Sequence, residues 1–296
     1  SMRKRNRDAL IKVEQIAPIG QNLDEEMLVD FENMGTRLFS NDGRGLQSAQ
    51  KMYEAMQVIS NMNGILIAHT EDESLSGSGC AHPSLKAIRQ GIDTFNELSE
   101  TTQIARDLVL ADKTACHYHI CHLSSEKSVE LIRFAKEKGV KVSSEVTPHH
   151  LLLSKEDIDY RDANYKMNPP LREKTDQKAL LKALNEGVIE CIASDHAPHH
   201  KTEKEQGFEK APFGIISLDF AFPLLYTQLV LTNKLSLETL LDRMSNGPRR
   251  ILNQKEIFIQ EGDDADLAVF DLNTERILKA EALHSKSQNT PFLGEK

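Results

Sequence analysis

The chain has 296 residues and a formal net charge of −9, and this acidic balance argues against nucleic acid as the main partner. It contains neither an apolar run long enough to span a membrane nor a charged segment followed by an apolar one, the pattern of a secretory signal. With 39% hydrophobic residues the chain can bury a sizeable core, and its length suits an α/β barrel. We expect a cytoplasmic protein.

Short apolar runs with a common pattern recur along the chain. Each opens on Gly or a small polar residue, continues through Val, Ile and Leu, and ends in Asp, Glu or His. Runs of this kind are typical of strands that are covered on both faces. They occupy residues 35–43, 64–72, 114–124, 139–150 and 187–200, with a weaker sixth case at residues 10–20.

Helical patterns lie between these runs, at residues 48–62, 124–139 and 176–187. The first places Met52, Met56 and Ile59 on one face, and the other two end in Gly, a residue that commonly follows a helix. Alternation of strands and helices with parallel crossovers predicts an α/β fold.

The pattern changes near residue 253. Leu267 to Phe270 alternate as an exposed strand would, and no helical pattern follows them. We therefore expect residues 1–252 to form a (β/α) barrel and residues 253–296 to form the remnant of a small β appendage.

Acidic and imidazole side chains end five of the predicted strands, namely Asp42, His69, His122, His149 and Asp195. Loop residues are often polar, so one such strand end would mean little. In a parallel barrel, however, the C-terminal strand ends open onto one face, where the active site lies. Imidazoles and carboxylates that converge there are a ligand set for Zn²⁺ or a similar ion.

Other kinds of site find less support in the sequence. Cys116 and Cys121 could bind zinc, but they do not form the closely spaced CxxC pair that thiolate zinc sites use. Three of the four cysteines lie in strand-like runs, which suits buried, reduced thiols. The sequence has no Gly-x-Ser-x-Gly motif for a serine nucleophile, and residues 74–80 lack the Lys and the helix of a phosphate-binding loop.

Six segments resemble the dihydroorotase family of the amidohydrolase superfamily, in the family's order. They are IAHTEDESL (67–75), CHYHICHLS (116–124), EVTPHHLLL (145–153), YKMNPPLR (165–172), SDHAPHHKTEK (194–204) and KAPFGI (210–215). The last but one is similar to the family signature Asp-x-Ala-Pro-His with a following Lys or Arg. The resemblance implies a TIM barrel that binds two zinc ions in the complete family enzyme.

The resemblance also implies roles for single residues. Asp42 would bridge two metal ions after the fourth barrel strand, and His69 and His122 would be ligands from the fifth and sixth strands. Asp195, after the eighth, would be both a ligand and the general acid and base. The substrate would contact Asn168, His199 and the backbone of Pro212, Phe213 and Gly214. Since FSNDG (39–43) contains no lysine, the aspartate-bridged bacterial type is favoured over the type with a modified lysine.

For the remaining polar residues we expect plainer roles. His117 and His119 alternate with Tyr118 and should serve in packing or hydrogen bonding. His149 and His150 could be structural or could support the ligands, and Arg172 could pair with a substrate carboxylate or with an Asp. We expect His82, His200 and His284 to be solvated.

The chain departs from the family pattern at its start. The family's first strand carries a His-x-His ligand pair and a substrate-binding Arg, and its second strand ends in a substrate-binding Asn, and we find none of these here. The expectation is an N-terminally truncated barrel without its first two strands. Its metal site would be empty or partly occupied and its activity impaired.

Three functions follow from this sequence. The first is dihydroorotase, which reversibly hydrolyses the cyclic amide of dihydroorotate to N-carbamoyl-aspartate in pyrimidine biosynthesis. The second is a cyclic amidase of hydantoinase or allantoinase type. The third is a non-catalytic fragment or scaffold. Expected partners are the small-molecule substrate and either a second copy of the chain or another enzyme of pyrimidine synthesis.

Overall fold

The computed structural model describes residue 6, residues 8–262, residue 265 and residues 267–295. The chain packs into two compact units, each built from three segments. Unit 1 comprises Ser1–Gly77, Glu97–Cys121 and Glu130–Ser144, and unit 2 comprises Ser78–Asn96, His122–Val129 and Glu145–Lys296. The chain thus passes from one unit to the other five times, after residues 77, 96, 121, 129 and 144.

Unit 1 is built on parallel strands. These are β1 (Leu38–Phe39), β2 (Ile65–Ala68), β3 (His117–Ile120) and the start of β4 (Val142–Val146). β1 pairs with β2, β2 with β3 and β3 with β4, all in parallel. The predicted parallel α/β fold is therefore confirmed. The weak run at residues 10–20 forms no strand, only two isolated bridges, a parallel one from Ala17 to Phe39 and an antiparallel one from Gly20 to Leu28.

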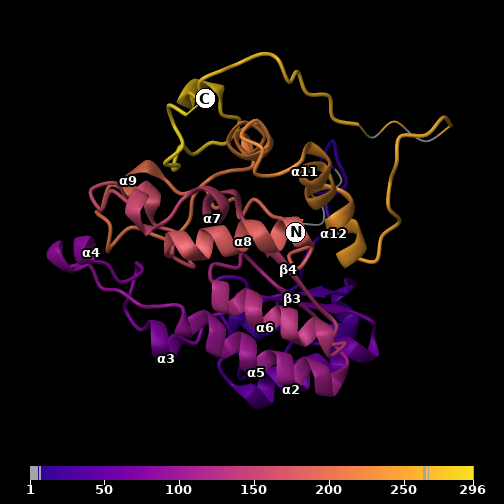
Figure 1. Cartoon of the computed structure of the whole chain (residues 1–296). Helices are drawn as coiled ribbons and strands as arrows, with labels where there is room; N and C mark the ends of the chain where they lie inside the picture. The colour runs from indigo at the N-terminus through magenta and orange to yellow at the C-terminus, as the bar shows by residue number, and fades with distance from the viewer. Residues whose placement is uncertain (1–5, 7, 263–264, 266, 296) are drawn as a thin grey trace. The chain divides into compact units, whose positions relative to one another are not determined.

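Helix α2 (Ala49–Asn61) forms where the sequence predicts it. The side chain of Ser48 caps the helix by accepting a hydrogen bond from the backbone N–H of Lys51. Met52, Met56 and Ile59, the predicted inner face, are all buried. α2 packs against β2 and against α5 (Leu98–Thr114), and Figure 1 shows the two helices side by side.

Helix α5 was not predicted, although it is the longest helix of the described chain, with 17 residues. Its buried face carries Glu100, Gln103 and Asp107 among its apolar residues. These polar side chains interrupt the apolar stripe from which an amphipathic helix is recognised. They are buried because they form hydrogen bonds there, as Asp107 does with Tyr118 Oη at 2.9 Å.

In unit 2, the end of β4 pairs in parallel with β5 (Cys191–Ile192) through Glu145 and Val146. The predicted helix at residues 176–187 is α8 (Lys174–Glu186), and it ends at Gly187 in a left-handed conformation. The predicted helix at 124–139 is α6 (Glu126–Glu137), which begins in unit 2 and ends in unit 1.

The remaining elements are short. In unit 1 they are the 3₁₀ turns η1 (Gln21–Leu23) and η2 (Phe31–Met34) and helix α3 (Glu73–Ser76). In unit 2 they are α4 (Leu85–Arg89), α7 (Pro148–Leu152), η3 (Lys155–Asp157), η4 (Ala163–Tyr165), α9 (Lys201–Lys204), α10 (Ala221–Leu225), the π-helical turn η5 (Tyr226–Val230), α11 (Leu237–Met244), α12 (Asn246–Ile251) and η6 (Ala280–Ala282).

An aromatic core lies inside unit 2. It includes two edge-to-face pairs, Tyr160 with Phe208 at 4.9 Å and Phe220 with Phe292 at 6.0 Å between ring centroids. Phe292 brings the C-terminal segment into this core. The pairs add to the hydrophobic stabilisation by about 0.5–1.5 kcal/mol each.

The strand predicted at Leu267–Phe270 is not formed. These four residues have no regular secondary structure, and Val269 is 94% exposed. An alternating pattern produces a strand only when a neighbouring strand satisfies its backbone groups. The described residues offer Leu267–Phe270 no such partner. The assignment of residues 253–296 to a β appendage stays a prediction.

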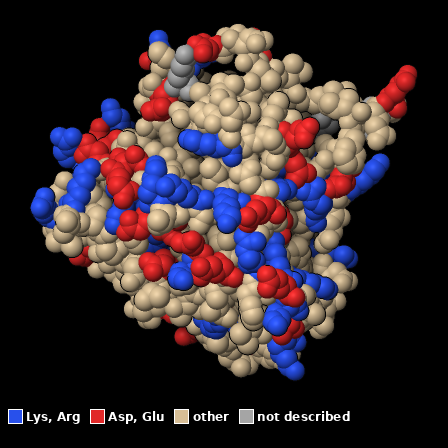
Figure 2. All heavy atoms as spheres, in the orientation of Figure 1, with Lys and Arg blue, Asp and Glu red and all other residues tan. Residues whose placement is uncertain are grey.

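The surface and the cysteines agree with the composition. On the face drawn in Figure 2, basic and acidic side chains are interspersed. All four cysteines are buried thiols, and burial raises the pKa of Cys116 to about 12. In the part of the chain that the structure describes, no helix combines the length and the apolar character that crossing a membrane requires.

Candidate functional site

Unit 1 carries two of the four predicted metal ligands. Asp42 lies three residues after β1 and is exposed. His69 follows β2 directly and is buried, with its Nε2 2.9 Å from Oε2 of Glu71. A carboxylate that holds one ring nitrogen of a histidine fixes the orientation of the ring, an arrangement common around metal ligands. Sequence analysis did not identify Glu71.

Unit 2 carries the other two predicted ligands, and both have an unusual backbone. His122 follows β3 with φ 34°, and Asp195 follows β5 with φ 45°. The left-handed region disfavours residues with a Cβ by about 1–2 kcal/mol. Such residues are found preferentially at functional sites, where the surrounding structure holds them in place. This strain supports a functional role for both strand ends, independently of the sequence motif.

We expect this strain to be measurable at Asp195. Because glycine adopts positive φ without penalty, Asp195→Gly should be more stable than Asp195→Ala by about 1 kcal/mol in urea unfolding. Glu205 provides the control, since its φ of −74° should make the alanine variant the more stable of the pair. Equal stability of the two Asp195 variants would show that the strand end is relaxed.

His149 lies next to Asp195 within unit 2. It is fully buried, and its Nε2 is 4.0 Å from Oδ2 of Asp195. Neither ring nitrogen makes a hydrogen bond among the described residues. Burial lowers the pKa of His149 well below its usual value, so the ring is neutral. This position places His149 beside a predicted ligand without a hydrogen bond to it, so both interpretations of its role stand.

His150, its neighbour in the sequence, has the other role. Its Nδ1 lies 2.7 Å from Oγ1 of Thr147, and its Nε2 lies 3.0 Å from the carbonyl oxygen of Pro169. Burial lowers its pKa to about 3. A carbonyl oxygen can only accept, so Nε2 donates and the neutral ring links two loops. His150 is therefore structural.

The predicted packing roles of two further histidines are confirmed in unit 1. His117 Nε2 and His119 Nδ1 lie 2.8 and 2.9 Å from the hydroxyl oxygen of Ser143. The prediction for His82 was wrong. This residue is buried, and its Nδ1 lies 3.4 Å from the guanidinium of Arg172. Nothing in its sequence neighbourhood distinguished it from a solvated histidine.

Arg172 is buried and contacts other segments of unit 2. Its Nε donates to Oγ of Ser124 at 3.0 Å, and its Nη1 donates to the carbonyl of Phe95 at 3.3 Å. The guanidinium also lies 5.3 Å from the centre of the Phe95 ring. These contacts connect three separate segments of unit 2, which is a structural role. Asn168 is partly exposed and precedes the cis peptide bond to Pro169.

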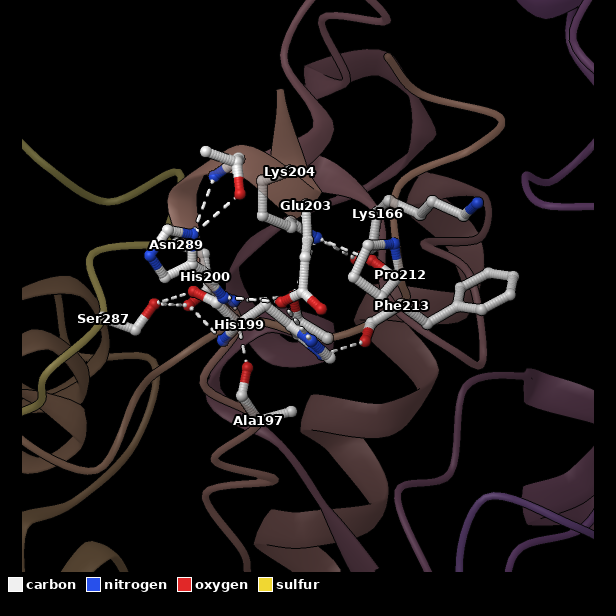
Figure 3. Close-up of polar contacts among 12 residues, drawn as sticks. Lys166, Ala197, His199, His200, Glu203, Lys204, Pro212, Phe213, Ser287 and Asn289 are labelled. Carbon is white, nitrogen blue, oxygen red and sulfur yellow. Dashed lines mark hydrogen bonds and ion pairs between the residues drawn. The ribbon is translucent and has the colours of Figure 1, made fainter. Parts of the chain in front are cut away.

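The substrate segment, Pro212–Gly214, whose backbone is predicted to contact the substrate, is held by two side chains of unit 2 (Figure 3). Nζ of Lys204 donates to the carbonyl oxygens of Pro212 at 2.9 Å and Gly214 at 3.0 Å. Nδ2 of Asn289 also donates to the Gly214 carbonyl, at 3.0 Å. His199 joins this group, because its Nε2 lies 2.7 Å from the Phe213 carbonyl oxygen.

Residues near the C-terminus complete the arrangement. Asn289 is buried, and its Oδ1 accepts a hydrogen bond from the backbone N–H of His199 at 3.2 Å. The hydroxyl of Ser287 lies against the His199 carbonyl and 2.5 Å from Oδ1 of Asn289. No sequence motif drew attention to Ser287 or Asn289. Lys204 belongs to the quoted signature, but we had assigned it no role.

These contacts leave few backbone N–H and carbonyl groups of the substrate segment available to a ligand. All three carbonyls of residues 212–214 are engaged, and the Gly214 N–H donates to the Lys166 carbonyl at 2.9 Å. Pro212 has no N–H. Among the described residues, the Phe213 N–H makes no hydrogen bond, so it is the backbone donor that remains for a ligand.

Comparison with known proteins gives consistent results. A family model described as dihydro-orotase-like matches residues 2–128. A protein of Staphylococcus epidermidis named dihydroorotase is 46% identical over 291 residues, which are 97% of this chain and 68% of that protein. Two solved structures described as D-hydantoinase have a similar fold.

The first D-hydantoinase has a TM-score of 0.74 and is 25% identical, over 86% of this chain and 59% of its own. The second has a TM-score of 0.83 and is 24% identical, over 99% of this chain and 68% of its own. The chain therefore spans 59% to 68% of the lengths of these three proteins.

Proposed function

Because this chain belongs to the dihydroorotase family, we propose that it catalyses the dihydroorotase reaction. In this reaction the cyclic amide of dihydroorotate is reversibly hydrolysed to N-carbamoyl-aspartate. One observation carries the proposal, namely the 46% identity to a dihydroorotase across 97% of the chain. A stretch of that length necessarily includes all six motif segments and the four proposed metal ligands.

The proposed metal site consists of Asp42, His69, His122 and Asp195. Two imidazoles and two carboxylates are a donor set that suits zinc. The contact between His69 and Glu71 and the left-handed backbone at His122 and Asp195 support these assignments. A bound zinc ion would lower the pKa of water to about 7 and polarise the ring carbonyl.

Asp195 moves the proton in the proposed reaction. Its carboxylate takes a proton from the attacking water as the oxygen adds to the carbonyl carbon of the ring. It then gives this proton to the amide nitrogen as the carbon–nitrogen bond breaks, and the ring opens to a carboxylate and a ureido group. The neutral, buried ring of His149 packs beside Asp195, with its Nε2 4.0 Å from the Asp195 carboxylate.

The substrate would be held by Asn168, His199 and the Phe213 N–H. Nε2 of His199 is engaged with the Phe213 carbonyl, and its Nδ1, which lies 4.0 Å from Oε2 of Glu203, would contact the ligand. A carboxylate or carbonyl oxygen of the substrate would accept from the Phe213 N–H. The substrate contact that the resemblance implies for the backbone of Pro212, Phe213 and Gly214 is thereby narrowed to one donor, the Phe213 N–H.

Two other functions predict different results. A hydantoinase-like cyclic amidase would use other cyclic amides, although FSNDG (39–43) lacks the lysine of that type. A non-catalytic protein would bind the substrate or another protein without turnover. The two D-hydantoinase structures fit the first alternative, at 24% to 25% identity, but the 46% identity to a dihydroorotase favours the proposed reaction.

Substrate preference will distinguish the three functions. The purified 296-residue chain, supplied with zinc, should cleave dihydroorotate at an impaired rate, but in preference to hydantoin and allantoin. Asp195→Asn should reduce this rate by at least about 100-fold, the usual contribution of general acid–base catalysis. Glu205→Gln, an exposed change in the same unit, is the matched control. Faster cleavage of hydantoin or allantoin would identify an amidase, and zinc binding without turnover of any of the three would identify a non-catalytic protein.

A further inference from the structure

Lys204 is a buried lysine without a carboxylate partner among its hydrogen bonds. It is only 7% exposed, and its ammonium group donates to three backbone carbonyls, those of Lys166, Pro212 and Gly214. Three donors that meet three carbonyl oxygens use the full hydrogen-bonding capacity of the side chain. Figure 3 shows Lys204 directed at the chain around Pro212.

Burying this charge is unfavourable for the fold. Burial, followed by the nearby charge of Lys166 and opposed by that of Asp162, lowers the pKa of Lys204 to about 8. A lysine whose pKa is lower in the folded state than in the unfolded state destabilises the protein in its charged form. An apolar residue of the same length at position 204 would therefore stabilise the fold equally well.

Most of the carbonyls that Lys204 holds have a second partner. The Lys166 carbonyl also accepts from the Gly214 N–H, and the Gly214 carbonyl also accepts from Asn289. Only the Pro212 carbonyl depends on Lys204 among the contacts described. Removing the ammonium would thus leave one carbonyl unsatisfied, which is a modest loss for the whole protein but a direct one for this segment.

The segment itself must follow one narrow path. Gly214 has φ 120°, and a Cβ there would lie 2.5 Å from Cβ of Ala197 and 3.2 Å from Nε2 of His199. The backbone therefore passes Ala197 at a distance, and with a φ, that only glycine allows, and it runs close beside His199. A small shift of Pro212 or Phe213 would break the contact between the Phe213 carbonyl and His199, and would redirect both the Phe213 N–H and the His199 ring.

We propose that Lys204 is a positioning residue for substrate, which fixes the backbone of Pro212–Gly214 so that the Phe213 N–H and the His199 imidazole are both placed for the ligand. The ligand class is a small cyclic amide with a hydrogen-bond acceptor for the Phe213 N–H. The inference rests on the proposed function in one respect, namely the identity of this ligand. The geometry of the segment is independent of it.

The test compares Lys204→Met, Lys204→Gln and Lys204→Arg with the wild-type chain. Hydrogen exchange of the backbone at residues 212–216 reports on the segment without any ligand. Dihydroorotate affinity, measured by calorimetry on the zinc-supplied chain, reports on substrate positioning. Lys201→Met is the matched control, because Lys201 lies on the same helix and its side chain is 81% exposed. Urea unfolding of every variant records global stability.

The Met and Gln variants should unfold at the same urea concentration as the wild type, whereas exchange of the Gly214 amide should accelerate by about tenfold and affinity for dihydroorotate should fall by a similar factor. Arginine should restore both, since it offers donors in the same region. Unchanged exchange at residues 212–216 in the Met variant would overturn the inference. So would a loss of global stability in the Met and Gln variants that accounts for the faster exchange. If the wild-type chain does not bind dihydroorotate, the proposed function fails, and the exchange measurement still decides the role of Lys204.

Discussion

Acidification from pH 7 to pH 5 is expected to reduce the free energy of unfolding by roughly 4 kcal/mol, through one partly buried and one buried histidine. Burial lowers the pKa of His117 to about 4 and that of His150 to about 3. In the unfolded chain both histidines take up a proton near pH 6.5. Below that pH the unfolded state binds more protons than the folded state, and stability falls by about 1.4 kcal/mol per pH unit for each histidine.

Two other buried groups modify this effect. His149, whose pKa is also lowered, adds to the loss. Asp107 opposes it, because burial raises its pKa, so the folded state takes up that proton at a higher pH than the unfolded state does. Since typical domains are stable by about 5–15 kcal/mol, this loss would be a large fraction of the free energy of unfolding.

Urea unfolding at half-unit pH intervals, with a chelator present so that metal release does not contribute, will measure the effect. Replacing both His117 and His150 with glutamine should flatten the pH dependence between pH 7 and pH 5. His200→Gln should leave it unchanged, because that side chain is exposed. An equally steep dependence in the double variant would assign acid sensitivity to other groups.

Asp107→Ala is expected to lower the free energy of unfolding by about 3–5 kcal/mol. The carboxylate of Asp107 is fully buried and accepts from Arg106 Nε at 2.7 Å, Tyr118 Oη at 2.9 Å and Gln103 Nε2 at 3.3 Å. Removing the acceptor leaves three donors without it, one of them charged. An unsatisfied buried donor costs about 1–3 kcal/mol, and more if it is charged.

The same substitution should loosen the loop after β1. Arg106, oriented by Asp107, also donates to the carbonyls of Leu46 and Gln47 at 2.6 and 2.7 Å. Hydrogen exchange at residues 44–48 should therefore rise in Asp107→Ala by more than the loss of global stability requires. Asp112→Ala, an exposed change on the same helix, is the control for helix propensity. A loss below 1 kcal/mol for Asp107→Ala would mean that the network contributes little to the fold.

The strands were predictable because their signal is local and repeated. Every main run, from 35–43 to 187–200, contains a strand of the structure, since an apolar run that is covered on both faces has few alternatives to a buried strand. The strand ends followed from the same pattern. The roles of His149 and His150 did not, because two adjacent histidines differ only in what the rest of the chain brings near them.

Features that depend on distant partners escaped prediction. Asp107 is polar on a buried helix face, and only its contact with Tyr118 explains it. Nothing in the sequence around Lys204 distinguishes it from an exposed lysine. Its burial depends on carbonyls that two other segments supply. The strand prediction for Leu267–Phe270 was wrong for the opposite reason. The alternating pattern is visible in the local sequence, but a strand also needs a pairing partner from elsewhere in the chain.

The path of the chain between its two units has a consequence for synthesis on the ribosome. Unit 1 needs residues as late as Ser144, and unit 2 needs segments on both sides of residues 97–121. At about 5–20 residues per second, several seconds pass between the emergence of β1 and that of β4, with the edges of the first strands unpaired. No single cleavage would separate the two units. The nascent chain is thus open to aggregation until its middle third has emerged, and we expect its yield in cells to depend on chaperones more than that of a chain with contiguous domains.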